Sequence, residues 1–172
     1  MKNYQLILLA VLSVLASCGI SNTSSADFSA EDTSLLADQH TKVENGLHGV
    51  MQIRDTITIG EPLELKFTVS NSADTAQQFL KWATPFEPLV SKYLDIVDED
   101  GTQVNYRGPM AKRAMPPSPD SYIKVNPNGS LVSNINLLEG YAITRPSKYT
   151  VIYVGQGMSG ITVSDSVIFV YR

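Results

Sequence analysis

The sequence predicts an all-β fold, an antiparallel β-sandwich of two sheets, preceded by a disordered N-terminal tether. Two observations support this prediction: short runs in which every second residue is apolar, and turn residues between the runs. No helical period of useful length and no alternation of strands with helices occurs among the runs, which disfavours an α/β fold. A β-barrel is the alternative arrangement for the same strands.

The run at residues 62–71 is the clearest, because Leu63, Leu65, Phe67 and Val69 alternate with polar residues. Such a strand buries one face and exposes the other to water. The other predicted strands are residues 50–57, 76–82, 93–99, 103–107, 121–125, 130–137, 148–154 and 164–171. Turn chemistry separates them, and "DEDGTQ" at residues 98–103 predicts a tight hairpin.

These strands predict one sandwich domain over residues 46–172, large enough to fold around a core without disulfide bonds. Four residues are its candidate core members: Phe67, Trp82, Tyr149 and Val151. Trp82 is alternatively an exposed binding aromatic, but a single tryptophan at the end of an alternating strand is more often buried.

The N-terminus reads as an export signal over residues 1–17, with Lys2 before an apolar run and "LASC" at residues 15–18. This pattern resembles the lipobox of bacterial lipoproteins. The resemblance implies a lipid-modified, palmitate-bearing Cys18 and a membrane anchor, and Gly19 after it implies the outer membrane, on either its periplasmic or its external face. An ordinary signal peptide with an incidental cysteine is the alternative.

Residues 18–45 are rich in Ser, Thr, Ala and acidic residues, which is typical of a flexible tether, with a weak helix signal at residues 34–42. Without Lys2 the chain has 12 basic and 17 acidic residues, a net charge of about −5. Nucleic acid is therefore excluded as an expected partner, because phosphate binding depends on a basic surface.

The inventory of chemistry-bearing residues predicts no enzyme, metal or cofactor. The two histidines, His40 and His48, are too few for a zinc hydrolase site, and a serine nucleophile would lack its oriented histidine. The glycine-rich residues 154–160 predict a flexible hairpin. The acidic residues at 95–100 predict a solvated turn, with a calcium site as the less favoured reading.

Residues 105–122 place Lys112 and Arg113 between Gly108-Pro109 and the prolines at 116, 117 and 119. Proline restricts its own backbone and that of the preceding residue, so this loop loses little entropy on docking. We expect it to face a partner. The alternatives are two solvated charges or a protease-sensitive site.

Three stretches, at residues 79–89, 104–130 and 141–153, together resemble the N-terminal, non-catalytic pro-region of deuterolysin-type (aspzincin) peptidyl-lysine metalloendopeptidases. The resemblance covers residues 62–154 and none of the zinc-binding catalytic domain. Ser147 departs from it, because the family has glycine there.

The resemblance implies an immunoglobulin-like sandwich that binds a zinc metallopeptidase and inhibits or chaperones it. The expected binding residues are Tyr106, Pro109, Lys112, Arg113 and Pro116. The alternative is a structural or adhesive cell-envelope lipoprotein with no peptidase partner.

Overall fold

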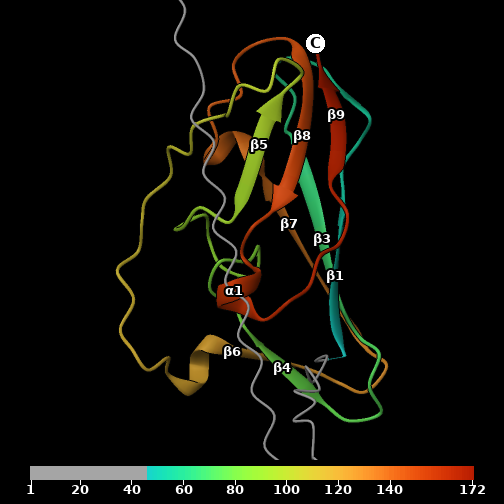
Figure 1. Ribbon diagram of the computed structural model, residues 1–172, viewed down its shortest axis with the longest axis vertical. Coiled ribbons are helices and arrows are strands. Elements are labelled where there is room, and N and C mark those ends of the chain that lie inside the picture. Colours follow the sequence, from blue (N-terminus) through green and yellow to red (C-terminus); the bar gives the residue numbers. More distant parts are fainter. Residues whose placement is uncertain (1–45) are drawn as a thin grey trace, which may run out of the picture. The chain divides into compact units, whose positions relative to one another are not determined.

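The computed structural model describes residues 46–172, which form nine strands and three short helical turns (Figure 1). The strands are β1 (Leu47–Gln52), β2 (Thr56–Ile57), β3 (Glu64–Asn71), β4 (Gln77–Leu80), β5 (Leu94–Asp98), β6 (Tyr122–Val125), β7 (Ser130–Asn136), β8 (Ser147–Tyr153) and β9 (Val167–Tyr171). The helical turns are η1 (Pro119–Ser121), η2 (Leu137–Glu139) and α1 (Gln156–Ser159). The predicted signal, Cys18 and the tether lie outside the described residues.

Two sheets, ordered β1-β3-β7 and β2-β9-β8-β5, make the sandwich, and every strand pair in them is antiparallel except β2 with β9. The predicted strand at residues 50–57 is two strands, because the chain crosses from the first sheet to the second between β1 and β2. The predicted all-β antiparallel sandwich is confirmed, and the sheets do not close into a barrel.

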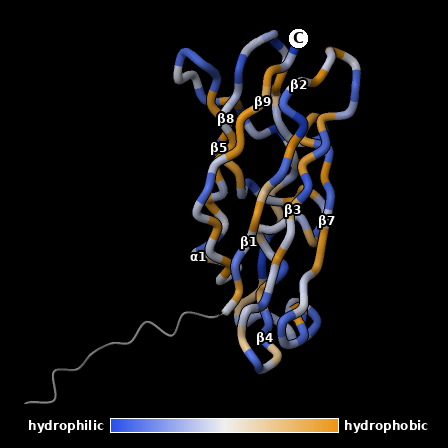
Figure 2. Tube along the Cα trace, turned by 90° about the vertical axis from the view of Figure 1, so that its right-hand side faces the viewer, coloured by the Kyte–Doolittle hydropathy of each residue, from blue (hydrophilic) through white to orange (hydrophobic). Residues whose placement is uncertain are grey.

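The core lies between the two sheets. Along β3, Leu65, Phe67 and Val69 are fully buried, and the Phe67 ring packs against Phe86 and Tyr153 at centroid distances of 6.4 and 5.3 Å. The predicted core residues Phe67, Trp82, Tyr149 and Val151 are all buried. In Figure 2, hydrophobic and hydrophilic residues alternate along strands such as β3, as period-two burial requires.

A tyrosine hydroxyl fixes the approach to β8. Tyr149 donates a hydrogen bond of 2.8 Å to the carbonyl of Arg145, four residues upstream. This arrangement is typical of Greek-key sandwiches. Ser147 begins β8 without a positive φ, so the turn does not need the glycine that the pro-region family has there.

Two local predictions are wrong. Residues 103–107 form isolated bridges, from Gln103 to Val97 and from Tyr106 to Tyr141, and no strand. Residues 154–160 contain the helical turn α1 in place of a flexible hairpin. Gly160, at φ 79°, ends that turn, and Ser159 is buried with its hydroxyl 2.7 Å from the Tyr153 hydroxyl. The turn is therefore tied to the core.

A third, two-stranded sheet of β4 and β6 lies at the end of the molecule that Figure 1 draws at the bottom. Residues 81–93, here called the strap, lead from β4 to β5. Residues 105–118, here called the basic loop, lead from the β5 hairpin to η1. The predicted tight hairpin is confirmed: Asp98 accepts the backbone N–H groups of Asp100 and Thr102.

Candidate functional site: the basic loop and the strap

The strap begins with a tight turn in which Ala83 has φ 57°, an uncommon conformation for a residue with a side chain. Thr84 stabilises this turn, because its hydroxyl donates to the carbonyl of Lys81 at 2.6 Å and accepts the N–H of Phe86 at 3.1 Å. Tyr153 of β8 donates to the carbonyl of Ala83 at 3.0 Å. These bonds hold the strap against the sandwich.

The strap buries one carboxylate, Glu87, and the basic loop supplies its counter-ion. Oε1 of Glu87 accepts the backbone N–H of Ala83 at 3.1 Å and a guanidinium N–H of Arg113 at 2.5 Å. The guanidinium also lies over the Trp82 ring, 5.0 Å from its centroid. The Arg113 side chain is 23% exposed. Charge pairing and cation–π attraction thus act on Arg113 together.

Tyr106 attaches the start of the basic loop. Its hydroxyl is bonded to the carbonyls of Leu89 at 2.8 Å and Pro109 at 3.0 Å, and its ring meets Tyr141 edge-on at 5.2 Å. The ring lies over Gly108, where a Cβ atom would come within 2.3 Å of the hydroxyl. A backbone bond of 2.7 Å from Ala111 to Val90 joins the loop to the strap again.

The outer surface of the loop is cationic and apolar. Lys112 is exposed and forms no ion pair within residues 46–172. Met110 and Met115 are 70% and 73% exposed, and Pro109 and Pro116 are exposed as well. No acidic residue occurs between Asp100 and Asp120. The loop therefore carries positive charge in a domain whose charge is otherwise mixed.

Four tyrosines surround the base of the site. Burial raises the pKa of Tyr141 and that of Tyr153 to about 12. Burial, followed by neighbouring tyrosines and Glu87, raises the pKa of Tyr93 further, and its hydroxyl has no hydrogen-bond partner among the described residues. Burial and the Glu87 charge also raise the pKa of Tyr106. All four side chains are held as neutral phenols at physiological pH.

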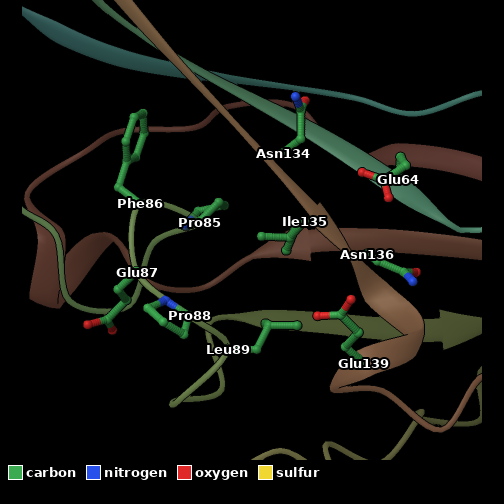
Figure 3. Close-up of a pocket in the computed structure, with 10 residues that line it drawn as sticks. All are labelled: Glu64, Pro85, Phe86, Glu87, Pro88, Leu89, Asn134, Ile135, Asn136 and Glu139. Carbon is green, nitrogen blue, oxygen red and sulfur yellow. The ribbon is translucent and has the colours of Figure 1, made fainter.

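A groove of about 490 Å³ runs between the strap and the edge of β7 (Figure 3). Its lining comes from the strap, β3, β7 and η2: Glu64, Pro85, Phe86, Glu87, Pro88, Leu89, Asn134, Ile135, Asn136 and Glu139. Figure 3 shows Glu64 and Glu139 at one end and Phe86 and Glu87 at the other. The end lined by Glu64 and Glu139 is the acidic one, because the charge of Glu87 at the other end is neutralised by Arg113.

The structure separates the two cations that the sequence placed together: Arg113 faces inward and Lys112 faces water. Tyr106 is also half-buried and bonded within the domain, whereas Pro109 and Pro116 are exposed. Sequence reasoning missed Glu87. Its signal was a single acid among the apolar and proline residues of "TPFEPL".

Within residues 46–172, no group of three or more His, Cys, Asp or Glu side chains is arranged to hold a metal ion. Asp98, from the acidic run, is buried and takes part in the hairpin turn, with Arg145 at 2.6 Å. None of the helices in this part of the chain has the length and hydropathy needed to cross a bilayer.

Three solved structures are distant likenesses of this chain. An alkylpurine DNA glycosylase from Pseudomonas fluorescens shares 13% identity over 74% of this chain and 30% of its own, with a TM-score of 0.36. A β-glucosidase from Listeria innocua shares 8% over 73% and 16%, with a TM-score of 0.37. A PapD-like domain of human CEP192 shares 15% over 83% and 94%, with a TM-score of 0.33.

The chain thus spans less than a third of the glycosylase and about a sixth of the glucosidase. No curated protein matches it. A family model, by contrast, matches residues 51–164, which include all of the strap and the basic loop. The chain belongs to the immunoglobulin-like domain family.

Proposed function

We propose that the protein is a non-catalytic binding module, anchored to the outer membrane through a lipid on Cys18, and that the basic loop is its contact surface. The proposed partner is a zinc metallopeptidase of the aspzincin type, which the module inhibits or chaperones. The immunoglobulin-like sandwich supports the binding role. The similarity to the aspzincin pro-region, given above, suggests the partner.

One observation carries the proposal: Lys112 is exposed at the surface of a loop that Tyr106, Ala111 and Arg113 attach to the strap. A loop held in this way has already lost most of its conformational entropy, so docking costs less than it would for a free loop. A single lysine on a rigid support suits the acidic specificity pocket of a peptidase that prefers lysine.

The two cations take different roles in this proposal. Arg113 positions the loop, because it is bonded to Glu87 and stacked on Trp82. Lys112 makes the contact, and the exposed Met110 and Met115, which flank it in the sequence, add apolar surface to the loop.

The test uses the mature chain, residues 18–172, with Cys18→Ser to prevent lipidation. We expect it to inhibit a lysine-specific metalloendopeptidase at micromolar concentration. Lys112→Ala should raise the inhibition constant at least about tenfold, or about 1.4 kcal/mol. Lys124→Ala, at an exposed lysine on β6, is the matched control and should have no effect. No inhibition by the wild type, or equal losses for both variants, would refute the proposed partner.

A structural or adhesive envelope lipoprotein is the second candidate. Apolar side chains exposed on β8, on β9 and just after β8 favour it: Ile152, Val154 and Ile168 are 44–47% exposed. Under this alternative, capture of envelope components by the protein would be unaffected by Lys112→Ala and lost on Ile152→Lys with Ile168→Lys.

A further inference from the structure

We infer that the free edge of β7 is a docking site for an extended, basic segment of a partner protein, which would add to the sheet β1-β3-β7 as a fourth strand. This site is separate from the surface of Lys112. It consists of the outward-facing backbone of β7 and the acidic end of the neighbouring groove.

The hydrogen-bond register determines which backbone groups of β7 face outward. At the two ends of the β3–β7 pairing, Leu137 donates to the carbonyl of Leu63 and Asn71 donates to the carbonyl of Gly129, both at 2.9 Å. Hydrogen-bonded pairs recur at every second residue of an antiparallel ladder. The odd-numbered residues of β7 therefore bond to β3, and the N–H and C=O groups of Val132 and Asn134 point away from it.

The hydrogen bonds at the opposite edge of the same sheet support this assignment of inward-facing and outward-facing residues. Because the odd residues of β3 bond to β7, its even residues bond to β1, and the odd residues of β1 must face outward. Gly49 does so, since its N–H donates to the carbonyl of Thr162 at 2.8 Å. That contact covers the β1 edge at Gly49. At the β7 edge the contact with the strap is made by a side chain, because the Ser133 hydroxyl donates to the carbonyl of Pro85 at 2.6 Å, and the outward backbone groups are left open.

No backbone group of Val132 or Asn134 has a backbone partner outside its own strand pairing within residues 46–172. Both residues are exposed. A row of unpaired N–H and C=O groups is a template for another strand. The basic loop leads through η1 to β6, and β6 pairs with β4 instead of β7.

The groove beside this edge favours a positively charged ligand. Glu64 and Glu139 line one end, and neither forms an ion pair within the described part of the chain. Glu64 also borders a hollow with Arg54 and Lys66, which remain unpaired with it. The apolar wall of Pro85, Phe86, Pro88 and Leu89 suits the aliphatic part of a lysine or arginine side chain.

An extended segment directs alternate side chains to the same face, so lysine or arginine at every second position would reach this end of the groove. β7 contains no lysine or arginine of its own. Charge complementarity therefore favours a foreign basic strand over a second copy of this chain that pairs through the same edge.

The experiment titrates a short synthetic peptide of alternating lysine and valine into the isotope-labelled mature chain with Cys18→Ser. Amide chemical shifts are recorded at low salt. We expect perturbations at Val132, Asn134 and Glu139. Val132→Pro removes an outward N–H without removing a bond to β3, and should weaken binding at least about tenfold. Glu64→Gln with Glu139→Gln keeps the backbone intact and should also weaken it, more at low salt than at high salt.

Asp74→Asn with Asp165→Asn, two exposed acids outside the groove, is the matched charge control and should leave affinity unchanged. Melting temperatures establish that each variant is folded. Perturbations confined to the basic loop, no perturbation at millimolar peptide, or full affinity in the Glu64 and Glu139 double variant would each overturn the inference. A concentration-dependent dimer abolished by Val132→Pro would show a second copy to be the occupant and would overturn it too.

Discussion

Two buried carboxylates, Glu87 and Asp98, each bond to an arginine from a distant loop, yet the two pairs differ in their exposure to water. The side chains of Glu87 and Arg113 are 5% and 23% exposed. Those of Asp98 and Arg145 are 3% and 64% exposed. Arg145 is thus little desolvated by its pairing with Asp98. Arg113 is largely desolvated, and its guanidinium also contacts the Trp82 ring.

The two carboxylates also differ in what remains if the arginine is removed. Asp98 still accepts two backbone N–H groups from its own hairpin, at 3.1 and 2.8 Å. Glu87 keeps one, from Ala83. The Asp98 pair is therefore added to a turn that forms locally. The Glu87 pair joins two segments, the strap and the basic loop, that nothing local would bring together.

The largest expected effect is a loss in the free energy of unfolding at high pH, caused by the buried tyrosines near the strap. Burial raises the pKa of Tyr141 and that of Tyr153 to about 12, against about 10 in an unfolded chain. Between these values the unfolded chain releases protons that the folded chain keeps. The contribution of these two tyrosines to the free energy of unfolding is therefore fully present below pH 10. It falls as the pH rises toward 12, by about 1.4 kcal/mol per pH unit for each tyrosine.

Urea unfolding at pH 8, 10 and 11 measures this slope. Tyr141→Phe and Tyr153→Phe should each make it shallower, since each removes one titrating group. Tyr122→Phe, on the exposed side of β6, is the control. A wild-type stability that is flat from pH 10 to 11 would contradict the expected linkage.

Arg113→Ala has the next largest expected effect, a loss of about 2 kcal/mol in the free energy of unfolding. It strands the Glu87 charge in a buried position, and the loss is below the usual 3–5 kcal/mol because Arg113 is partly exposed. Amide hydrogen exchange should accelerate over residues 105–118. Arg113→Lys should restore part of this loss, because an ammonium group keeps the positive charge. The recovery should be incomplete, because lysine lacks the planar guanidinium.

A coupling energy between Glu87→Ala and Arg113→Ala close to zero would contradict this account, since the double variant should lose much less than the sum of the single ones. Exchange that stayed slow across the loop in Arg113→Ala would also show that Tyr106 and Ala111 suffice to hold it.

The strand pattern made the sandwich predictable, and the site depended on contacts that no local pattern contains. The alternation of Leu63, Leu65, Phe67 and Val69 identified a strand and its buried face, and burial of Trp82 followed from its size. The confirmed hairpin at Asp98 needs only neighbours in sequence. These are all properties that adjacent residues determine.

Arg113 illustrates the limit, because its neighbour Lys112 has the same charge and the opposite environment. Glu87, 26 residues away, decides between them, and their meeting requires the strap and the loop to be folded already. The run at residues 103–107 shows the same limit in reverse. It alternates like a strand, yet its partner changes along its length, from β5 at Val104 to Tyr141 at Tyr106, so no continuous ladder forms. The open edge of β7 likewise follows from strand order, which alternation does not encode.

Arg145→Ala has the smallest expected effect, a loss of about 0.5 kcal/mol or less. A largely exposed arginine contributes little in high dielectric, even at 2.6 Å from its carboxylate. Asp98 remains bonded to Asp100 and Thr102, so the hairpin keeps its geometry. Urea unfolding of Arg145→Ala beside Arg113→Ala, in the same buffer, measures the difference directly. Equal losses would mean that burial of the carboxylate alone sets the strength of such a pair, and that the exposure of the arginine does not matter.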